Sequence, residues 1–435
     1  MRQSRESADH GSQIDPTARR GRRRRGLTIT AIVLAVILLA VGGYTGWALT
    51  APLPVPVANS QTPAGATPRP AVIALPSEGA SALSIEGGED YLGPSASGIW
   101  ASSGDAAPRS IASITKLITA LVILDAKPLA DAHDRGPTIV FGKAAHDLYD
   151  AYYVRGATIA PMPTGTELSL RDALATMLIP SASNYADAMS TWAFGSRSAF
   201  LSATATWLAA HGLTGTTIVE PTGLDPRNTS TPADLIAIGK LAAANPVVSG
   251  IVATPSLSLP GPGPMLNTND LLGRNGITGL KTGNLGSGSF NLLYTASLDV
   301  GAAQPLTVTG VMLGGASRQS VDSEVLALLD SIRNGFRDVP LATSGQQIGT
   351  FTTPWGSEAQ MVLAEDASIF AWSDTSVTAT MSTTTPETYE DGEPVGTVTW
   401  TAGPNTATAS VEVEGSIEPP TAWWRLTHPS ELFAQ

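Results

Sequence analysis

The sequence predicts an α+β protein that carries one N-terminal transmembrane helix and ends in a small all-β domain. Three observations support this prediction. Residues 27–49 contain no charged side chain, residues 72–338 mix helical and strand patterns, and Thr, Val, Gly and Pro dominate after about residue 340. The chain has 435 residues, which is enough for two or three domains with a sizeable core.

The composition excludes several classes of site. Cysteine is absent, which rules out disulfides, thiolate nucleophiles and cysteine-based metal sites. The five His residues show no metal-ligand spacing, so the sequence predicts neither a metal nor a cofactor and argues against a zinc hydrolase. Residues 1–26 carry eight Arg and three acidic residues, and the chain as a whole has a net charge of −12. The rest of the chain is therefore strongly acidic, which argues against nucleic acid as a partner.

The apolar segment 27–49 is long enough to cross a bilayer as a helix. Six Arg lie between residues 19 and 25, and the next basic residue after the segment is Arg69. The positive-inside rule therefore places residues 1–26 in the cytoplasm and the chain after about residue 50 outside the cell membrane. A cleaved signal peptide is the alternative. Its apolar core is normally shorter, and Pro52 follows Ala51, the best candidate for a cleavage site, so an uncleaved single-pass anchor is favoured.

The region outside the membrane divides into three parts. Six Pro residues make 50–71 an extended linker, and a globular domain follows over 72–338. Its patterns predict strands at 80–85, 97–101, 292–298 and 306–312, and helices at 114–126, 170–194 (broken at Pro180), 232–244 and 323–336.

Residues 339–435 are predicted to form the β domain, in which helical signals are lacking. Residues 395–400 and 406–413 alternate with period two around a turn at 403–405. We expect this domain to act as a stand-off or interaction platform, with Trp423 and Trp424 packed rather than ligand-binding.

Ser113 and Lys116 form the first motif with chemical meaning. They stand at positions i and i+3 at the start of an apolar helical pattern, so they share one helix face. A neutral Lys can act as a general base toward a Ser hydroxyl if burial and nearby cations lower its pKa. The alternative is an N-capping Ser and a solvated Lys.

Lys281, Thr282 and Gly283 form the second motif, set in what looks like a strand. The edge of such a strand can offer backbone groups to a peptide, with the glycine allowing a close approach. Lys281 would add positive charge for a carboxylate or an oxyanion. The alternative is a hairpin strand with a surface Lys.

The third motif lies in the segment IPSASNYAD, which contains Ser181, Ser183 and Asn184. Taken alone, Ser and Asn before an apolar run are more often helix caps than catalytic groups. It points to a functional site only because it lies between the other two motifs in the sequence.

The order S-x-x-K, Ser/Asn motif, K-T-G resembles the penicillin-binding proteins and serine β-lactamases. The segments SIASITKLITALVILD, LIPSASNYADAM, PTGLDPRNTSTPADLIAIGKL, GITGLKTG and VTGVMLGG narrow the resemblance to the low-molecular-mass, serine-type D-alanyl-D-alanine carboxypeptidases, over about residues 72–338. The C-terminal β domain weakly resembles one found in part of that family. The N-terminal span would replace the C-terminal amphipathic anchor of many relatives.

The resemblance implies a β-lactamase/transpeptidase-like domain, with a five-stranded antiparallel sheet between helices and a helical subdomain over 140–245. It implies that Ser113 attacks the penultimate D-Ala carbonyl of a peptidoglycan stem peptide, that Lys116 takes its proton, and that Ser181 relays a proton to the leaving amine. The N–H groups of Ser113 and Asn284 would form the oxyanion hole. The groups expected to hold the terminal carboxylate are Lys281, Thr282 and Arg318, and β-lactams should acylate the same serine.

One departure from the family motif bears on activity. The family has Ser-x-Asn, whereas here Ser183 stands at the third position and Asn184 follows it. This departure leaves three alternatives. Ser183 substitutes for the Asn as a shorter polar group, or the loop shifts so that Asn184 reaches the cleft. The third alternative is that turnover is impaired. The alternatives to a carboxypeptidase are a β-lactamase or esterase on the same fold and an inactive peptidoglycan-binding relative. No Glu motif for rapid deacylation is evident between Asn184 and Lys281.

Overall fold

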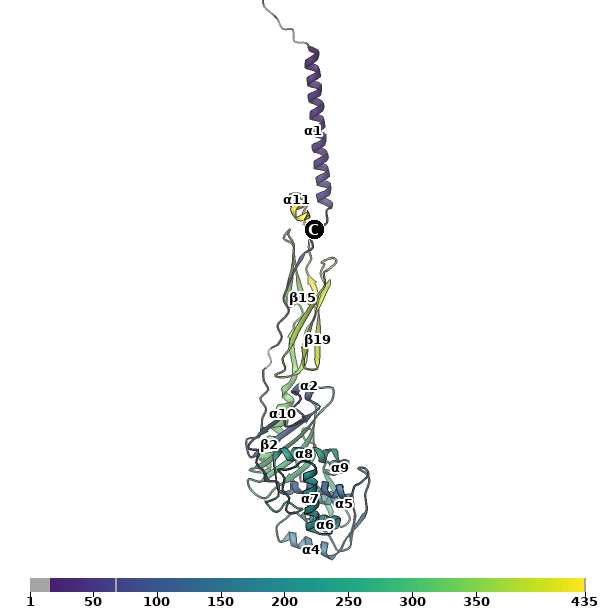
Figure 1. Ribbon diagram of the computed structural model, residues 1–435, viewed down its shortest axis with the longest axis vertical. Helices are drawn as coiled ribbons and strands as arrows, with labels where there is room; N and C mark the ends of the chain where they lie inside the picture. The colour runs from purple at the N-terminus through teal and green to yellow at the C-terminus, as the bar shows by residue number, and fades with distance from the viewer. Residues whose placement is uncertain (1–15, 67–68, 434–435) are drawn as a thin grey trace, which may run out of the picture.

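The computed structural model describes residues 16–66 and 69–433, with side chains from residue 25 onward. The molecule is elongated, with helix α1 (Pro16–Thr50) at one end, a six-stranded sheet in the middle and a second sheet with most of the helices at the far end (Figure 1). Of the predicted basic tail, residues 1–15 lie outside the described residues, and residues 16–26 continue α1.

No other segment among the described residues packs around most of helix α1. Its apolar part, Arg25–Thr50, has 26 residues and is unburied over its most apolar stretch. At 1.5 Å per residue it is ~39 Å long, more than the ~30 Å hydrocarbon core of a bilayer. A helix that is apolar on all sides and exposed to water would be unfavourable, so it requires lipid or a protein partner.

The predicted linker is not extended throughout. Val57–Ser60 forms strand β1, which pairs antiparallel with β14 (Gln347–Thr352), with Val57 opposite Thr352. This stretch lies between the Pro residues that precede it and Pro63, so all its backbone N–H groups are available. Part of the linker is therefore an edge strand of the C-terminal sheet.

The far domain contains a five-stranded antiparallel sheet in the order β10-β11-β12-β2-β3, with β10 at one edge. Its strands are β2 (Ala80–Glu86), β3 (Ala101–Ser103), β10 (Ile277–Gly283), β11 (Phe290–Leu298) and β12 (Leu306–Gly315). The predicted strand at 97–101 is displaced to β3, and the short helix α2 (Glu89–Leu92) follows the Gly-Gly pair.

Helices cover both faces of this sheet because the side chains of its strands alternate between two cores. On β11, Leu293 packs toward the helical subdomain, whereas Leu292 and Tyr294 pack toward helix α10 (Arg318–Gly335). Helix α10 begins five residues earlier than predicted because Ser317 caps it.

The remaining helices of the far domain form a subdomain against one face of this sheet. Its regular elements are η1 (Ala112–Ile114), α3 (Thr115–Ala126), α4 (Lys143–Tyr153), α5 (Leu170–Leu178), α6 (Ser183–Phe194), α7 (Arg197–Ala210), α8 (Pro232–Ala244) and α9 (Pro246–Val252), with short strand pairs β4–β7 (Arg109–Ser110, Thr229–Ser230), β5–β6 (Thr138–Phe141, Thr166–Ser169) and β8–β9 (Ser256–Leu259, Gly263–Leu266). Helix α8 has the predicted bounds: Thr231 caps it, Pro232 opens it, and Pro246 follows its end.

The C-terminal region is a six-stranded sheet in the order β1-β14-β15-β19-β18-β17, with the pair β13–β16 beside it. The fully buried Trp400 lies in its core. Its remaining strands are β13 (Phe336–Ala342), β15 (Glu358–Leu363), β16 (Ala367–Trp372), β17 (Thr378–Thr383), β18 (Pro394–Ala402) and β19 (Asn405–Glu414).

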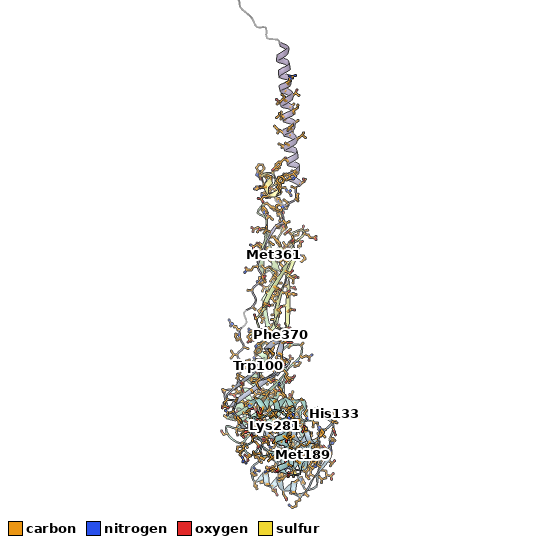
Figure 2. All side chains as sticks on the ribbon, viewed as in Figure 1. Trp100, His133, Met189, Lys281, Met361 and Phe370 are labelled. Atoms are coloured by element: carbon orange, nitrogen blue, oxygen red, sulfur yellow. The ribbon has the colours of Figure 1, made fainter. Side chains whose placement is uncertain are left out.

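Aromatic side chains of the β13–β16 pair pack against the far domain. Phe336 stacks on Phe370 with 5.9 Å between ring centroids and meets Trp372 edge-on at 4.9 Å. Trp100 from the far domain contacts Trp372 at 5.7 Å. Trp100 and Phe370 mark this junction in Figure 2, between Met361 of the C-terminal sheet and the far domain. The contacts provide a packed connection between the two regions.

Two short helices that the sequence pattern did not predict close the described chain, α11 (Ala422–Thr427) and α12 (Pro429–Phe433). Arg425 donates hydrogen bonds to the carbonyls of Ala48 (3.4 Å) and Ala51 (2.8 Å) at the end of α1. Such carbonyls lack partners within their own helix, which explains the contact. Trp424 packs against Trp355, whereas Trp423 is 74% exposed, so the expectation that both are packed is wrong for Trp423.

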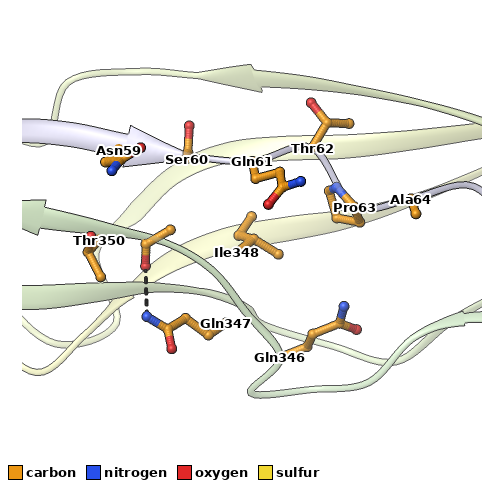
Figure 3. A pocket seen from close by; sticks show the side chains of 11 residues that line it. Asn59, Ser60, Gln61, Thr62, Pro63, Ala64, Gln346, Gln347, Ile348 and Thr350 are labelled. Carbon is orange, nitrogen blue, oxygen red and sulfur yellow. Dashed lines mark hydrogen bonds between the residues drawn. The ribbon is translucent and has the colours of Figure 1, made fainter.

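An open polar groove of about 470 Å³ lies along β1 and β14 (Figure 3). Amide and hydroxyl side chains such as Asn59, Gln61 and Gln346 line it. It belongs to the C-terminal sheet and includes none of the three sequence motifs.

Candidate active site

Ser113 lies in the single turn η1 that leads into α3, and it is partly exposed. The preceding residue, Ala112, has φ +48°, a strained value for a residue with a side chain. Nζ of Lys116 lies 2.9 Å from Oγ of Ser113. The i, i+3 spacing therefore brings the amine and the hydroxyl into hydrogen-bond distance.

Lys116 is fully buried, and its amine also donates a hydrogen bond to the Thr222 carbonyl at 2.7 Å. A carbonyl can only accept, so one N–H points at Thr222 whether the amine is charged or neutral. In the neutral amine, the lone pair is then available for the proton of Ser113. Burial lowers the pKa of Lys116 from 10.5 to about 7, against the opposing effect of the Glu220 carboxylate. Much of the amine is therefore neutral near pH 7.

The Lys281-Thr282-Gly283 strand lies directly beside Ser113. A Cβ at Gly283 would be 2.6 Å from the Ile111 carbonyl oxygen and 3.3 Å from the Ser113 nitrogen. Lys281 is 1% exposed, and Figure 2 shows it inside the far domain. Burial, with the charges of Lys116 and Arg318, holds the pKa of Lys281 well below its usual value. The two lysines thus lie close enough for the charge of Lys116 to lower the pKa of Lys281.

Arg318, in the first turn of α10, reaches the same site through Thr268. Its guanidinium donates to the Thr268 carbonyl and pairs with Asp270 at 3.2 Å. The Thr268 hydroxyl lies 2.8 Å from that of Thr282 and accepts a 3.4 Å hydrogen bond from Lys281. Thr268 thus connects the predicted residues Lys281, Thr282 and Arg318.

The backbone N–H groups of Ser113 and Asn284 have no acceptor among the residues that the structure describes. The side chain of the exposed Asn284 accepts a hydrogen bond from the Gly286 N–H at 2.7 Å, within the turn after β10.

Comparison with known proteins addresses the enzyme class. Residues 95–309 match the family model of D-alanyl-D-alanine carboxypeptidases. The chain contains the domain of the D-alanyl-D-alanine carboxypeptidase family. It is accordingly a serine-type D-Ala-D-Ala carboxypeptidase, which confirms the enzyme class that the motifs predict.

Solved structures confirm the fold. Penicillin binding protein 5 from Haemophilus influenzae aligns at 17% identity over 81% of this chain and 99% of its own, with a TM-score of 0.52. Penicillin binding protein 6B from Escherichia coli aligns at 19% identity over 80% of this chain and 97% of its own, with a TM-score of 0.53. A variant of the Streptomyces K15 DD-transpeptidase aligns at 22% identity over 59% of this chain and 97% of its own, with a TM-score of 0.50. A search of curated proteins found no match.

The middle motif of the carboxypeptidase lies where α5 gives way to α6. Ser181 has φ +69° and is 5% exposed, and its hydroxyl has no hydrogen-bond partner among the described residues. The Ser183 N–H donates to the Thr158 carbonyl at 2.8 Å.

Asn184 does not reach the cleft, in contrast to one of the sequence-based alternatives. Its carboxamide is fully buried, accepts from the Ala160 N–H at 3.1 Å and donates to the Ala160 carbonyl at 2.8 Å. Both ends of the amide are thus engaged with the segment before β6, which leaves Ser183 as the motif's third residue.

Sequence reasoning missed two residues of this site. Thr268 carries no recognisable motif, because its role depends on a loop folding back against β10. Glu220 comes directly before the segment PTGLDPRNTS. It is 8% exposed, and its charge acts on Lys116. A buried acidic residue next to a Pro-Thr-Gly turn was a usable signal, but only after the turn was known to face α3.

We expect Gly283→Ala to slow acylation by a β-lactam about 10- to 100-fold. The new methyl group would meet the Ile111 carbonyl at 2.6 Å and the Ala112 Cβ at 3.2 Å, which displaces Ser113 from the strand. Gly142→Ala is the matched control, because a Cβ there meets nothing within 4 Å. The measurement is the rate of fluorescent-penicillin labelling of each purified variant. Equal rates for Gly283→Ala and the native enzyme would show that this contact does not position the serine.

Proposed function

We propose that Ser113 is the nucleophile and Lys116 its general base in the removal of the terminal D-Ala from peptidoglycan stem peptides. The 2.9 Å contact between a partly exposed hydroxyl and a buried amine with a pKa of about 7 supports this assignment most strongly. Oγ of Ser113 bonds to the carbonyl carbon of the penultimate D-Ala while Nζ of Lys116 takes the hydroxyl proton.

The resulting oxyanion needs donors that are free before substrate arrives. The N–H groups of Ser113 and Asn284 meet this condition. The tetrahedral intermediate then breaks its C–N bond, and the leaving amine takes a proton from Lys116 through the Ser181 hydroxyl. Water hydrolyses the acyl-enzyme by the reverse proton path. Ser181 suits a relay because its hydroxyl has no competing partner among the described residues.

The terminal carboxylate of the substrate is assigned to the positive side of the cleft. The Thr282 hydroxyl and the charges of Lys281 and Arg318 would hold it, with Thr268 fixing their arrangement. Gly283 lets the substrate backbone approach the edge of β10, with Ser183 lining the opposite wall. A β-lactam carries the same carboxylate beside a reactive amide, so it should acylate Ser113.

We infer that the site lies at a distance from the membrane. We propose that α1 anchors the enzyme as a single-pass helix, with its N-terminus in the cytoplasm, and that the C-terminal sheet holds the catalytic domain outside the cell. The Arg-rich flank before the span supports this direction, and the elongated arrangement of Figure 1 supports the stand-off.

The test is D-Ala release from diacetyl-Lys-D-Ala-D-Ala by the full-length enzyme in detergent. We expect release from this peptide and none from its L-Ala-L-Ala counterpart, and prior incubation with benzylpenicillin should abolish it. A β-lactamase would instead hydrolyse benzylpenicillin at a steady rate without releasing D-Ala. An inactive relative would do neither, and either result would contradict the proposal.

A further inference from the structure

A buried carboxylate lies beside the Ser113–Lys116 pair without belonging to any of the three motifs. Glu220 is 8% exposed. It accepts hydrogen bonds from the Thr222 N–H at 2.8 Å, the Thr222 hydroxyl at 2.6 Å, the Gly223 N–H at 2.5 Å and the Asn228 amide at 2.9 Å. Every partner donates, which is the arrangement that an ionised carboxylate requires, since it can only accept.

These bonds shape the segment that touches the catalytic pair. The Thr222 carbonyl, between two of the anchored N–H groups, is the group that accepts from Nζ of Lys116 at 2.7 Å. Asn228 extends the connection to α3, because its amide also donates to the Thr115 hydroxyl at 3.1 Å. The carboxylate of Glu220 therefore fixes the carbonyl that orients the amine.

The charge of Glu220 acts on the amine as well. Burial lowers the pKa of Lys116, and Glu220 opposes this effect. The other charged groups of the site are Lys281, which faces Lys116 from β10, and Arg318, which acts on Lys281 and pairs with Asp270. Tyr152 of α4 also experiences the field of Glu220. Glu220 is thus the charge that directly opposes the effect of burial on the Lys116 amine.

We propose that Glu220 is a positioning residue for the Ser113–Lys116 pair, which holds the Thr222 carbonyl against the Lys116 amine and keeps that amine a strong enough base to activate Ser113. The proposal rests on the function proposed above. A general base is most effective when its pKa lies near the working pH, and an amine whose basicity falls further accepts the proton less readily.

The test is Glu220→Gln in the full-length enzyme, with the rate of fluorescent-penicillin acylation measured from pH 5 to 9. Removal of the carboxylate charge should lower the pKa of Lys116 further. The rise of the rate with pH should therefore move to lower pH by about one unit, and the plateau rate should fall. Asp225→Asn is the matched control, because it also removes a carboxylate from this segment. The Asp225 carboxylate pairs with Arg227 and does not act on Lys116. Its profile should match that of the native enzyme.

A second variant, Glu220→Asp, keeps the test decisive if Glu220→Gln folds poorly. It retains the carboxylate charge and a side chain that can only accept hydrogen bonds, so its profile should lie close to that of the native enzyme. If Glu220→Gln lowers the acylation rate but leaves its pH profile unshifted, Glu220 has only a structural role. That result would overturn the proposal. So would a Glu220→Asp enzyme that folds and shows the shifted profile. Failure of the native enzyme to acylate Ser113 at any pH would instead overturn the proposed function.

Discussion

Replacing Lys116 by alanine is expected to slow the acylation of Ser113 by about 10²- to 10⁴-fold, the usual contribution of a general base. The amine lies 2.9 Å from Oγ of Ser113, and none of the five His residues occurs in the motifs. Lys116→Arg is the matched variant, since it keeps the charge and most of the length but remains protonated at every accessible pH. The measurement is the second-order rate of penicillin labelling. An arginine variant that labels at the native rate would show that proton transfer to residue 116 is not required.

The native enzyme should show a related pH dependence. The neutral amine is the active form, and burial lowers the pKa of Lys116 to about 7. The acylation rate should therefore rise with pH through about 7 and fall about tenfold per unit well below it. A rate that is level from pH 5 to 9 would contradict this assignment, provided that thermal unfolding shows the enzyme intact throughout the range.

Gly223→Ala should abolish labelling at Ser113. A Cβ at this position would lie 1.9 Å from the Ala112 carbonyl oxygen and 2.9 Å from the Ser113 nitrogen, and the residue has φ +85°, which disfavours a side chain. The Thr222 carbonyl would have to move with it, away from Lys116. The rate of penicillin labelling and the thermal unfolding midpoint should both be measured.

Gly212→Ala separates the clash from backbone strain. Gly212 also has a positive φ, +69°, but a Cβ there meets nothing within 4 Å. We expect its unfolding free energy to fall by about 1 kcal/mol with labelling retained. Native-like labelling by Gly223→Ala would mean that residues 220–228 do not press against Ser113 as described.

The parts of the fold that sequence predicted are those set by local chemistry. Helix α8 has strong capping signals at both ends, and β18 and β19 alternate around a clear turn. The i, i+3 spacing of Ser113 and Lys116 survives folding because it depends on one helical turn. The period-two pattern also predicted β-structure in the C-terminal region, because each strand there packs one face inward.

What sequence missed depends on contacts between distant segments. Strand β1 exists because β14 offers it an edge, and α11 is placed by the free carbonyls of α1. Thr268 and Glu220 join the site through loops whose approach to β10 and α3 has no sequence signature. The choice between Ser183 and Asn184 was likewise undetermined, because the partner of Asn184 lies 24 residues away at Ala160.

The most direct test of the Ser-Lys mechanism is mass spectrometry of the full-length enzyme after brief exposure to benzylpenicillin at pH 8, followed by peptide mapping. The mechanism predicts one penicilloyl group per chain, carried by the Ser113 hydroxyl, and none on a Ser113→Ala variant. An adduct on any other residue, or D-Ala release by an enzyme that lacks the Ser113 hydroxyl, would contradict it.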